Sequence, residues 1–183
     1  MKLDVTLGKW FLGSLLALWL VSPQGVEIVR AQEQAVVGPH RGTWSAGTSI
    51  GFLGNTVDDT AFAWNLFADY FVDRHVSFGP LLQMGFTGNL TQVGLSGQGK
   101  YWIDLSGLSN KTRLNLQAGL GFVHADRGPS DTSFLVPIGI GLDHRVTEQM
   151  SLTADFLINF TDLNVGAGRT TTVMPGLTFG VRF

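Results

Sequence analysis

The sequence predicts an all-β protein, an eight-stranded antiparallel up-and-down transmembrane β-barrel. From residue 42 onward, apolar residues recur at every second position in eight segments, which is the period of a strand with two different faces. Charged residues make up only 14% of the chain, and 24 of the 183 residues are glycine. This is less charge and more glycine than ordinary soluble domains carry. No apolar run long enough for a membrane-spanning helix follows the N-terminal segment, so strands must account for this composition.

The composition also excludes several classes of function. A net charge of −2 gives no electrostatic basis for binding nucleic acid. The absence of cysteine excludes disulfide scaffolds, thiolate metal sites and cysteine nucleophiles. No histidine spacing indicates a metal site, and no cofactor is predicted.

The first 31 residues are predicted to be a cleaved signal peptide. Lys2 and Lys9 bound a short basic region before an apolar core at residues 10–21, which is too short to span a bilayer as a helix but typical of a signal peptide. Cleavage is expected between Ala31 and Gln32, and an uncleaved anchor helix is the alternative. The predicted organisation is a signal peptide at 1–31, a short lead at 32–41 and a barrel at 42–183.

The eight predicted strands differ in how cleanly they alternate. They cover residues 43–52, 62–71, 76–86, 92–105, 113–122, 133–143, 150–160 and 172–183. The first alternates Trp44, Ile50 and Phe52 with small or polar residues. In the second to fourth, bulky side chains interrupt the polar face, namely Phe67, Phe71, Leu81 and Trp102. The last four alternate more cleanly, although Pro137 and Pro175 are unusual inside strands.

The chemistry of the two faces decides between a soluble and a membrane barrel. A soluble barrel would bury its large apolar residues and expose charge. Here the polar face is rich in Gly, Ser, Thr and Gln, while the apolar face has almost no charge and would aggregate in water. Aromatic residues of the apolar face gather at both ends of the strands, as in the girdles of membrane barrels. We therefore expect the apolar face to be turned outward to lipid.

The C-terminal run Leu177–Phe183 alternates and ends in phenylalanine. In this it resembles the small bacterial outer-membrane barrels of the OmpA-like and OmpX-like group. The resemblance implies a Gram-negative outer-membrane location, both termini in the periplasm, and a monomer among phospholipid and lipopolysaccharide. It also implies that Phe179, Val181 and Phe183 form the signal for the barrel-assembly machinery. The loops expected outside are short for that group, which argues against an adhesin.

Strand parity places four acids and four bases on the inward face. These are Asp69, Lys100, Asp104, Arg113, Asp143, Arg145, Asp155 and Arg182. Because buried charges are tolerated when paired, we expect an ion-pair network that plugs the periplasmic half. Smaller groups line the other half, which predicts a small wet vestibule there. The alternative is that these residues only fill space in a closed barrel.

Two motifs suggest an enzyme, and neither has the context that catalysis needs. Gly47–Gly51 matches the G-x-S-x-G string, which requires a turn from a strand into a helix, whereas here it lies inside a strand. His75 and Ser77 are similar to the His-x-Ser pair of outer-membrane lipid A deacylases. In that family an Asn-Ala-x-Gly-like stretch follows the pair, but here Phe78 and Gly79 follow it.

The sequence therefore predicts a non-enzymatic barrel with a structural role in the envelope, or with a very narrow, porin-like pore. A surface-binding barrel and a lipid A-modifying hydrolase are the alternatives.

Overall fold

The computed structural model describes residues 41–105, 111–165 and 170–183. Its eight strands are β1 (Trp44–Thr56), β2 (Asp59–Asp73), β3 (Val76–Phe86), β4 (Thr91–Asp104), β5 (Thr112–Asp126), β6 (Ser130–Arg145), β7 (Ser151–Asn164) and β8 (Thr170–Arg182). Each strand pairs antiparallel with its neighbours in the chain, and β1 pairs with β8 to close the barrel. The predicted fold class is confirmed. The predicted signal peptide and its cleavage site at Ala31 and Gln32 lie outside the described residues.

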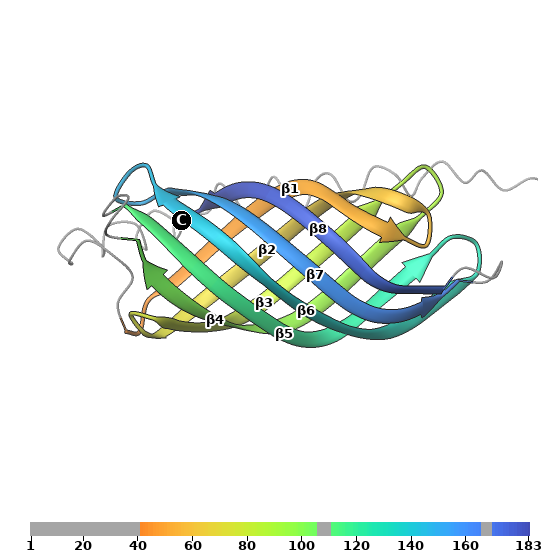
Figure 1. The fold of residues 1–183 in the computed structure, drawn as a ribbon, viewed down its shortest axis with the longest axis horizontal. Coiled ribbons are helices and arrows are strands. Elements are labelled where there is room, and N and C mark those ends of the chain that lie inside the picture. Colours follow the sequence, from red (N-terminus) through yellow and green to blue (C-terminus); the bar gives the residue numbers. More distant parts are fainter. Residues whose placement is uncertain (1–40, 106–110, 166–169) are drawn as a thin grey trace, which may run out of the picture. The chain divides into compact units, whose positions relative to one another are not determined.

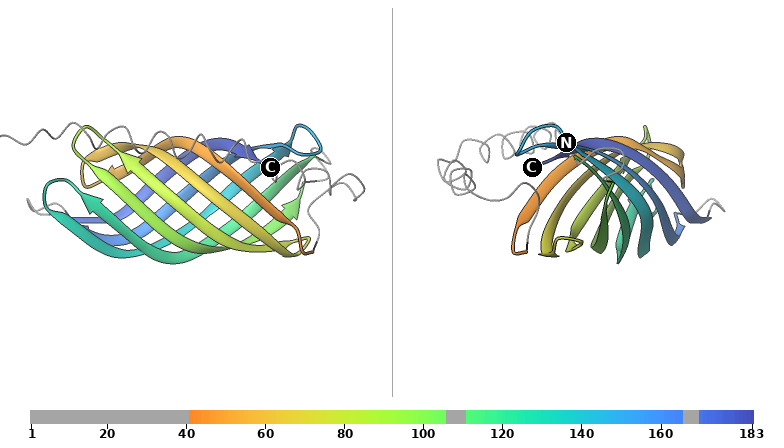
Figure 2. Two further views of the ribbon diagram at one scale, coloured as in Figure 1. Left: turned by 180° about the vertical axis from the view of Figure 1, so that it is seen from behind. Right: turned by 60° about the vertical axis from the view of Figure 1, so that its left-hand side comes forward.

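The strands are tilted across the barrel, and β1 lies beside β8 although the two strands are far apart in the sequence (Figure 1). We call the end where β1 begins and β8 finishes the terminal end. The β2–β3 and β6–β7 turns also lie there. The opposite end carries the β1–β2, β3–β4 and β5–β6 turns, and we call it the loop end. Figure 2 shows the same tilt from behind.

The turns at the loop end are shorter than the sequence suggested. The connection between the predicted strands 43–52 and 62–71 is reduced to a two-residue turn, because β1 continues to Thr56 and β2 starts at Asp59. Asn55 and Asp59 have positive φ angles of 53° and 65°, which Asn and Asp adopt more readily than most residues. A register shift between Leu53 and Thr56 accommodates the tight connection.

The two faces of the sheet have opposite chemistry. Outward side chains are large and apolar, and the most exposed of them include Leu120 (68%), Phe122 and Phe52. Inward side chains are small or polar, with a few bulky groups such as Trp102 (1% exposed) and Phe71. Pro137 faces inward and is buried, whereas Pro175 is exposed. Within the described part of the chain, no helix is long and apolar enough to cross a membrane.

Candidate functional site in the barrel lumen

A cluster of buried charges fills the lumen near the terminal end, with Asp69 at its centre. Asp69 Oδ2 accepts hydrogen bonds from Lys100 Nζ at 3.1 Å and Arg182 Nη1 at 2.6 Å. Arg182 Nε lies 2.9 Å from Asp143 Oδ2. These four residues come from β2, β4, β6 and β8, so the cluster joins alternate strands across the lumen. Strand alternation turns each of these side chains inward.

Aromatic rings form the walls of this cluster. The Arg182 guanidinium lies 4.7 Å from the Trp102 ring centre and 5.0 Å from that of Phe67, and Lys100 Nζ lies 4.9 Å from Phe67. Trp102 donates its indole hydrogen bond to Ser77 Oγ at 2.8 Å. Cations over ring faces gain electrostatic stabilisation, which is larger when they are desolvated. Phe67 and Trp102, two of the bulky residues that interrupt the alternation, therefore support the charges.

Asp104 and Arg113 form a second group, nearer the β2–β3 turn. Asp104 pairs with Arg113 at 2.8 Å and with Arg74 at 2.8 Å. Arg113 also donates to the Arg74 carbonyl oxygen at 2.6 Å. Arg74 was not among the predicted residues because it lies in a turn, where strand parity does not indicate which way a side chain points.

The other two predicted network residues have different surroundings. Asp155 accepts a hydrogen bond from the Gln117 side chain at 2.9 Å, and no ion pair within 4.0 Å joins it to a described cation. Arg145 is half-buried at the end of β6, and its side chain pairs with no described acid. The structure thus brings six of the eight predicted residues into ion pairs.

The loop end of the lumen is apolar, so the expected wet vestibule is wrong. One cluster of buried side chains fills it, consisting of Leu53, Val57, Ala63, Leu90, Val123, Ala125, Leu135, Leu163, Val165 and Met174. Val57 and Leu90 come from the β1–β2 and β3–β4 turns and fold inward. Val165 directly follows β7, and the others lie near the loop-end termini of their strands. We call this cluster the apolar plug.

Polar contacts tie the turns together above the apolar plug. Arg127 Nη2 lies 2.6 Å from Asp58 Oδ1, and Arg127 Nη1 donates to the Val57 carbonyl at 3.2 Å. Thr87 donates to Asp58 Oδ2 at 2.5 Å. These contacts link the β1–β2, β3–β4 and β5–β6 turns, and we call them the loop-end tie. Between the end of β7 and the start of β6, Asn164 N donates to Asp131 Oδ2 at 2.6 Å.

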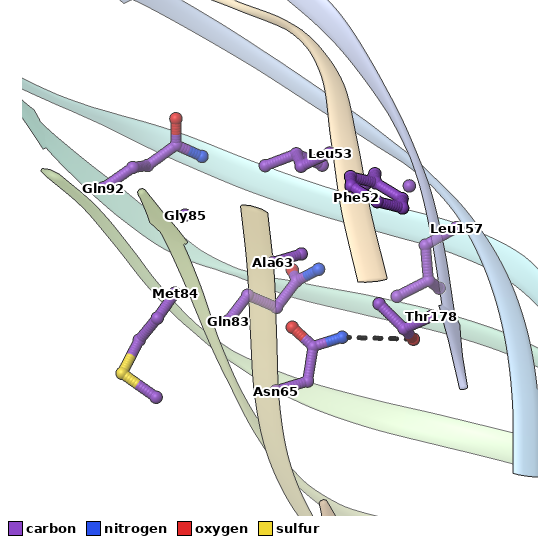
Figure 3. Close-up of a pocket in the computed structure, with 11 residues that line it drawn as sticks. Phe52, Leu53, Ala63, Asn65, Gln83, Met84, Gly85, Gln92, Leu157 and Thr178 are labelled. Carbon is purple, nitrogen blue, oxygen red and sulfur yellow. Dashed lines mark hydrogen bonds between the residues drawn. The ribbon is translucent and has the colours of Figure 1, made fainter. Parts of the chain in front are cut away.

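A small cavity lies between the apolar plug and a second apolar layer formed by Phe67, Leu81 and Leu157. Its volume is about 10 Å³. In Figure 3, Asn65 and Gln83 lie side by side in the cavity wall, and Asn65 reaches Thr178 through a hydrogen bond. The lumen is therefore filled in layers, with charges at the terminal end and apolar groups at the loop end.

The solved structures that resemble this fold include small outer-membrane barrels. Neisserial surface protein A aligns with a TM-score of 0.57 and 16% identity, over 76% of this chain and 94% of that one. The N-terminal β-barrel domain of Pseudomonas aeruginosa OprF aligns with a TM-score of 0.51 and 15% identity, over 79% and 100%. The chain has the fold of the small eight-stranded outer-membrane barrels.

A de novo designed transmembrane β-barrel aligns at a TM-score of 0.50 and 13% identity, over 80% of this chain and 98% of that one. No protein-family model matches the sequence, and no curated protein matches it. Identities of 13–16% show a common fold and no more. The role of this barrel therefore depends on its own residues.

The serines of the two motifs that suggested an enzyme are both buried and hydrogen-bonded to other side chains. Ser49 is buried inside β1 and donates a hydrogen bond to Thr178 at 3.1 Å. Ser77 is buried beneath Trp102, whereas His75 is exposed in the β2–β3 turn, stacked on Tyr101 and 3.6 Å from Asp73. Within the described ranges, no group of His, Asp or Glu side chains is arranged to hold a metal ion.

Proposed function

We propose that this protein is an integral barrel of a Gram-negative outer membrane, with a structural role in the envelope and a closed lumen. The observation that carries the proposal is the belt of exposed apolar side chains around all eight strands. In water such a belt would be an aggregation hazard, whereas in lipid it is satisfied and barrel closure leaves no unpaired backbone edge.

The filling of the lumen supports a closed barrel over a porin-like pore. The charged cluster, the layer of Phe67, Leu81 and Leu157, and the apolar plug follow one another between the two ends. A barrel of eight strands encloses little more than its own side chains. We therefore propose that no ion path runs through the resting protein.

The proposal includes the route to the membrane. Export would use the predicted signal peptide at 1–31, and assembly would use the C-terminal strand with Phe179, Val181 and Phe183. Phe179 and Phe183 are exposed on the outer face, where they are accessible to the barrel-assembly machinery. Once assembled, the barrel would be a monomer among phospholipid and lipopolysaccharide. The short, tied turns favour this role over an adhesin.

Two measurements test the proposal. The protein should fractionate with the outer membrane and change its gel mobility on heating, as a closed barrel does when it unfolds. In planar bilayers the folded protein should give no steady current above the bare membrane. A soluble fraction without a heat shift would refute membrane integration, and a steady current would refute the closed lumen.

A further inference from the structure

Two of the strand ladders are interrupted in their middle by a proline. Between β2 and β3 the pairing stops at Phe67 and Leu81 and resumes, in the same register, at Tyr70 and Phe78. The missing pairs are those of residues 68 and 69 with residues 80 and 79, and position 80 is Pro80. Proline has no N–H and cannot donate to the facing strand. We call this gap the β2–β3 seam.

The β5–β6 ladder has the same kind of interruption. Its pairing stops at Ala118 and Ile138 and resumes, again in register, at Gly121 and Leu135. The missing pairs are those of residues 119 and 120 with residues 137 and 136, and position 137 is Pro137. We call this gap the β5–β6 seam.

Elsewhere in the described strands the ladders are continuous or change register where they break. The other interruptions lie in β1–β2, β2–β3 and β7–β8, and each comes with a register shift. Pro175 makes no seam, because it pairs with Ile158 and its pairing toward β1 has already ended at Gly176. The two seams are therefore a specific effect of Pro80 and Pro137.

The three strands between the seams are joined without a break. β3 pairs with β4 at every position of residues 76–86, and β4 pairs with β5 at every position of residues 91–104. Figure 1 shows these strands side by side in the barrel wall. The seams lie on one row, since Pro80 pairs with Gly97, and Gly97 pairs with Leu120 of the β5–β6 seam. We call β3, β4 and β5 the panel.

A buried polar side chain lies on the panel between the two seams. Gln98 is 4% exposed, and neither its Nε2 nor its Oε1 has a hydrogen-bond partner in the described part of the chain. Gln98 pairs with Gly79 of one seam and Gly119 of the other. A Cβ at Gly119 would lie 3.0 Å from Gln98 Cγ and 3.2 Å from Pro137 Cγ, so this side chain lies beside the β5–β6 seam. A buried amide without partners destabilises the closed wall.

We propose that the panel is a lateral opening built into the barrel wall, which moves outward as one unit when both seams separate. The free energy of a local opening depends on the hydrogen bonds and buried contacts that are lost. At each seam a proline has already removed a hydrogen bond, and the Gln98 amide has no described partner to lose. The movement opens the wall sideways at the row of Gln98, so it is consistent with a lumen that is closed along its axis.

Backbone amide exchange, measured by NMR on the ¹⁵N-labelled protein folded in detergent, tests the separation of the seams. Successive N–H groups of a strand point to opposite neighbours. Ala68 and Gly119 stand opposite the prolines and face the seams, whereas the adjacent Asp69 and Leu120 face the strand on the other side. After correction for intrinsic rates, we expect Ala68 and Gly119 to exchange about tenfold faster, since one hydrogen bond contributes a factor of this order. Equal protection within each adjacent pair would overturn the proposal.

A disulfide across one seam tests whether the panel moves as one unit. The chain has no cysteine, and Leu120 and Val136 stand opposite each other in the register of the β5–β6 seam. Oxidation of Leu120→Cys/Val136→Cys should slow the exchange of Ala68, at the other seam, about tenfold relative to the reduced form. Leu82→Cys/Leu95→Cys is the matched control, because this pair lies inside the panel and its oxidation should leave Ala68 unchanged. An effect on Ala68 from neither disulfide would show that the seams open separately and would contradict the panel.

If the seam disulfide variant gives no heat-dependent gel shift, Pro80→Val replaces it. Pro80 is exposed, so valine restores the N–H without entering the lumen. Exchange should then slow at Ala68 and also at Gly119 on the far seam. A slower Ala68 with an unchanged Gly119 would rule out a common movement, while the gel shift of the same sample reports separately on the closed barrel.

Discussion

At the scale of single residues, Asp69 is the side chain on which the charged cluster depends. It is 1% exposed and accepts hydrogen bonds from two cations that are themselves buried. Removal of one partner from a buried ion pair leaves an uncompensated charge, which costs more than the pair contributed. Loss of Asp69 would leave Lys100 in that state, whereas Arg182 would keep only its contact with Asp143.

We therefore expect Asp69→Ala to lower the free energy of unfolding by about 3–5 kcal/mol. Urea unfolding of the barrel in lipid vesicles, followed by tryptophan fluorescence, measures the change. Asp162→Ala is the matched control, because Asp162 is exposed at the loop end and should shift stability by less than about 0.5 kcal/mol. Equal effects of the two variants would contradict a structural role for the cluster.

Two glycines on neighbouring strands give a second residue-scale prediction. A Cβ at Gly121 would overlap the carbonyl oxygen of Leu95 and the Cα of Ser96, whereas a Cβ at Gly97 would have no atom within 4 Å. Gly121→Ala should therefore destabilise the barrel by about 1–3 kcal/mol, the usual cost of overpacking. Gly97→Ala should leave it unchanged.

The folded fraction on an unheated gel, measured across a urea series, compares these two variants. The same midpoint for both would show that close strand approach does not explain the glycine at position 121.

At the scale of elements, the loop-end tie holds three turns above the apolar plug. Arg127 connects to Asp58 and to the Val57 carbonyl, and Val57 is itself part of the plug. Because Arg127 is about one-third exposed, each of its contacts is partly screened by water. The tie should therefore order the turns without determining whether the barrel folds.

Arg127→Gln should raise amide hydrogen exchange in the β1–β2 turn about fivefold, which corresponds to a loss of about 1 kcal/mol. Its urea midpoint should remain close to that of the unaltered protein. Arg145→Gln is the control, since Arg145 is at the terminal end and pairs with no described acid. Unchanged exchange near Val57 in the Arg127 variant would rule out the tie as an ordering device.

The strands could be predicted from sequence because parity fixes the face of every strand residue. It placed Asp69, Lys100 and Arg182 inside correctly, together with the bulky Phe67 and Trp102. Parity does not tell how far along the barrel axis a residue lies. It therefore did not predict which of the inward acids and bases pair with each other. Arg145 was included in the predicted network because it belongs to the inward face. It lies at the end of β6, however, where it pairs with no described acid.

Strand parity does not predict the direction of side chains in turns. Val57 and Leu90 fold into the lumen from turns, and Arg74 reaches Asp104 from another. A turn has no alternating period, and the direction of its side chains depends on the backbone conformation of a few residues. This is why a wet vestibule was predicted in place of the apolar plug, although strand alternation also turns Leu135 and Met174 inward.

At the scale of the whole molecule, the barrel reverses the usual distribution of side chains. Polar and charged groups are buried inside, while large apolar groups such as Ile50, Leu95 and Phe179 are more than half exposed outside. The stability of this arrangement therefore depends on the medium around the barrel. In water, an exposed leucine tolerates a charge at little cost, whereas at the bilayer midplane an arginine or lysine costs about 2–4 kcal/mol.

Leu120→Arg therefore tests whether the belt faces lipid. Leu120 is 68% exposed near the middle of β5, so an arginine at this position would not disturb the packing inside the protein. We expect this variant to lose about 2–4 kcal/mol of stability in phospholipid vesicles. Val146→Arg is the matched control, because Val146 is exposed in the β6–β7 turn, where the cost near the interface is about 0–1 kcal/mol. A belt that faces water would instead make both substitutions neutral, and equal stabilities of the two variants in vesicles would remove the basis for a membrane barrel.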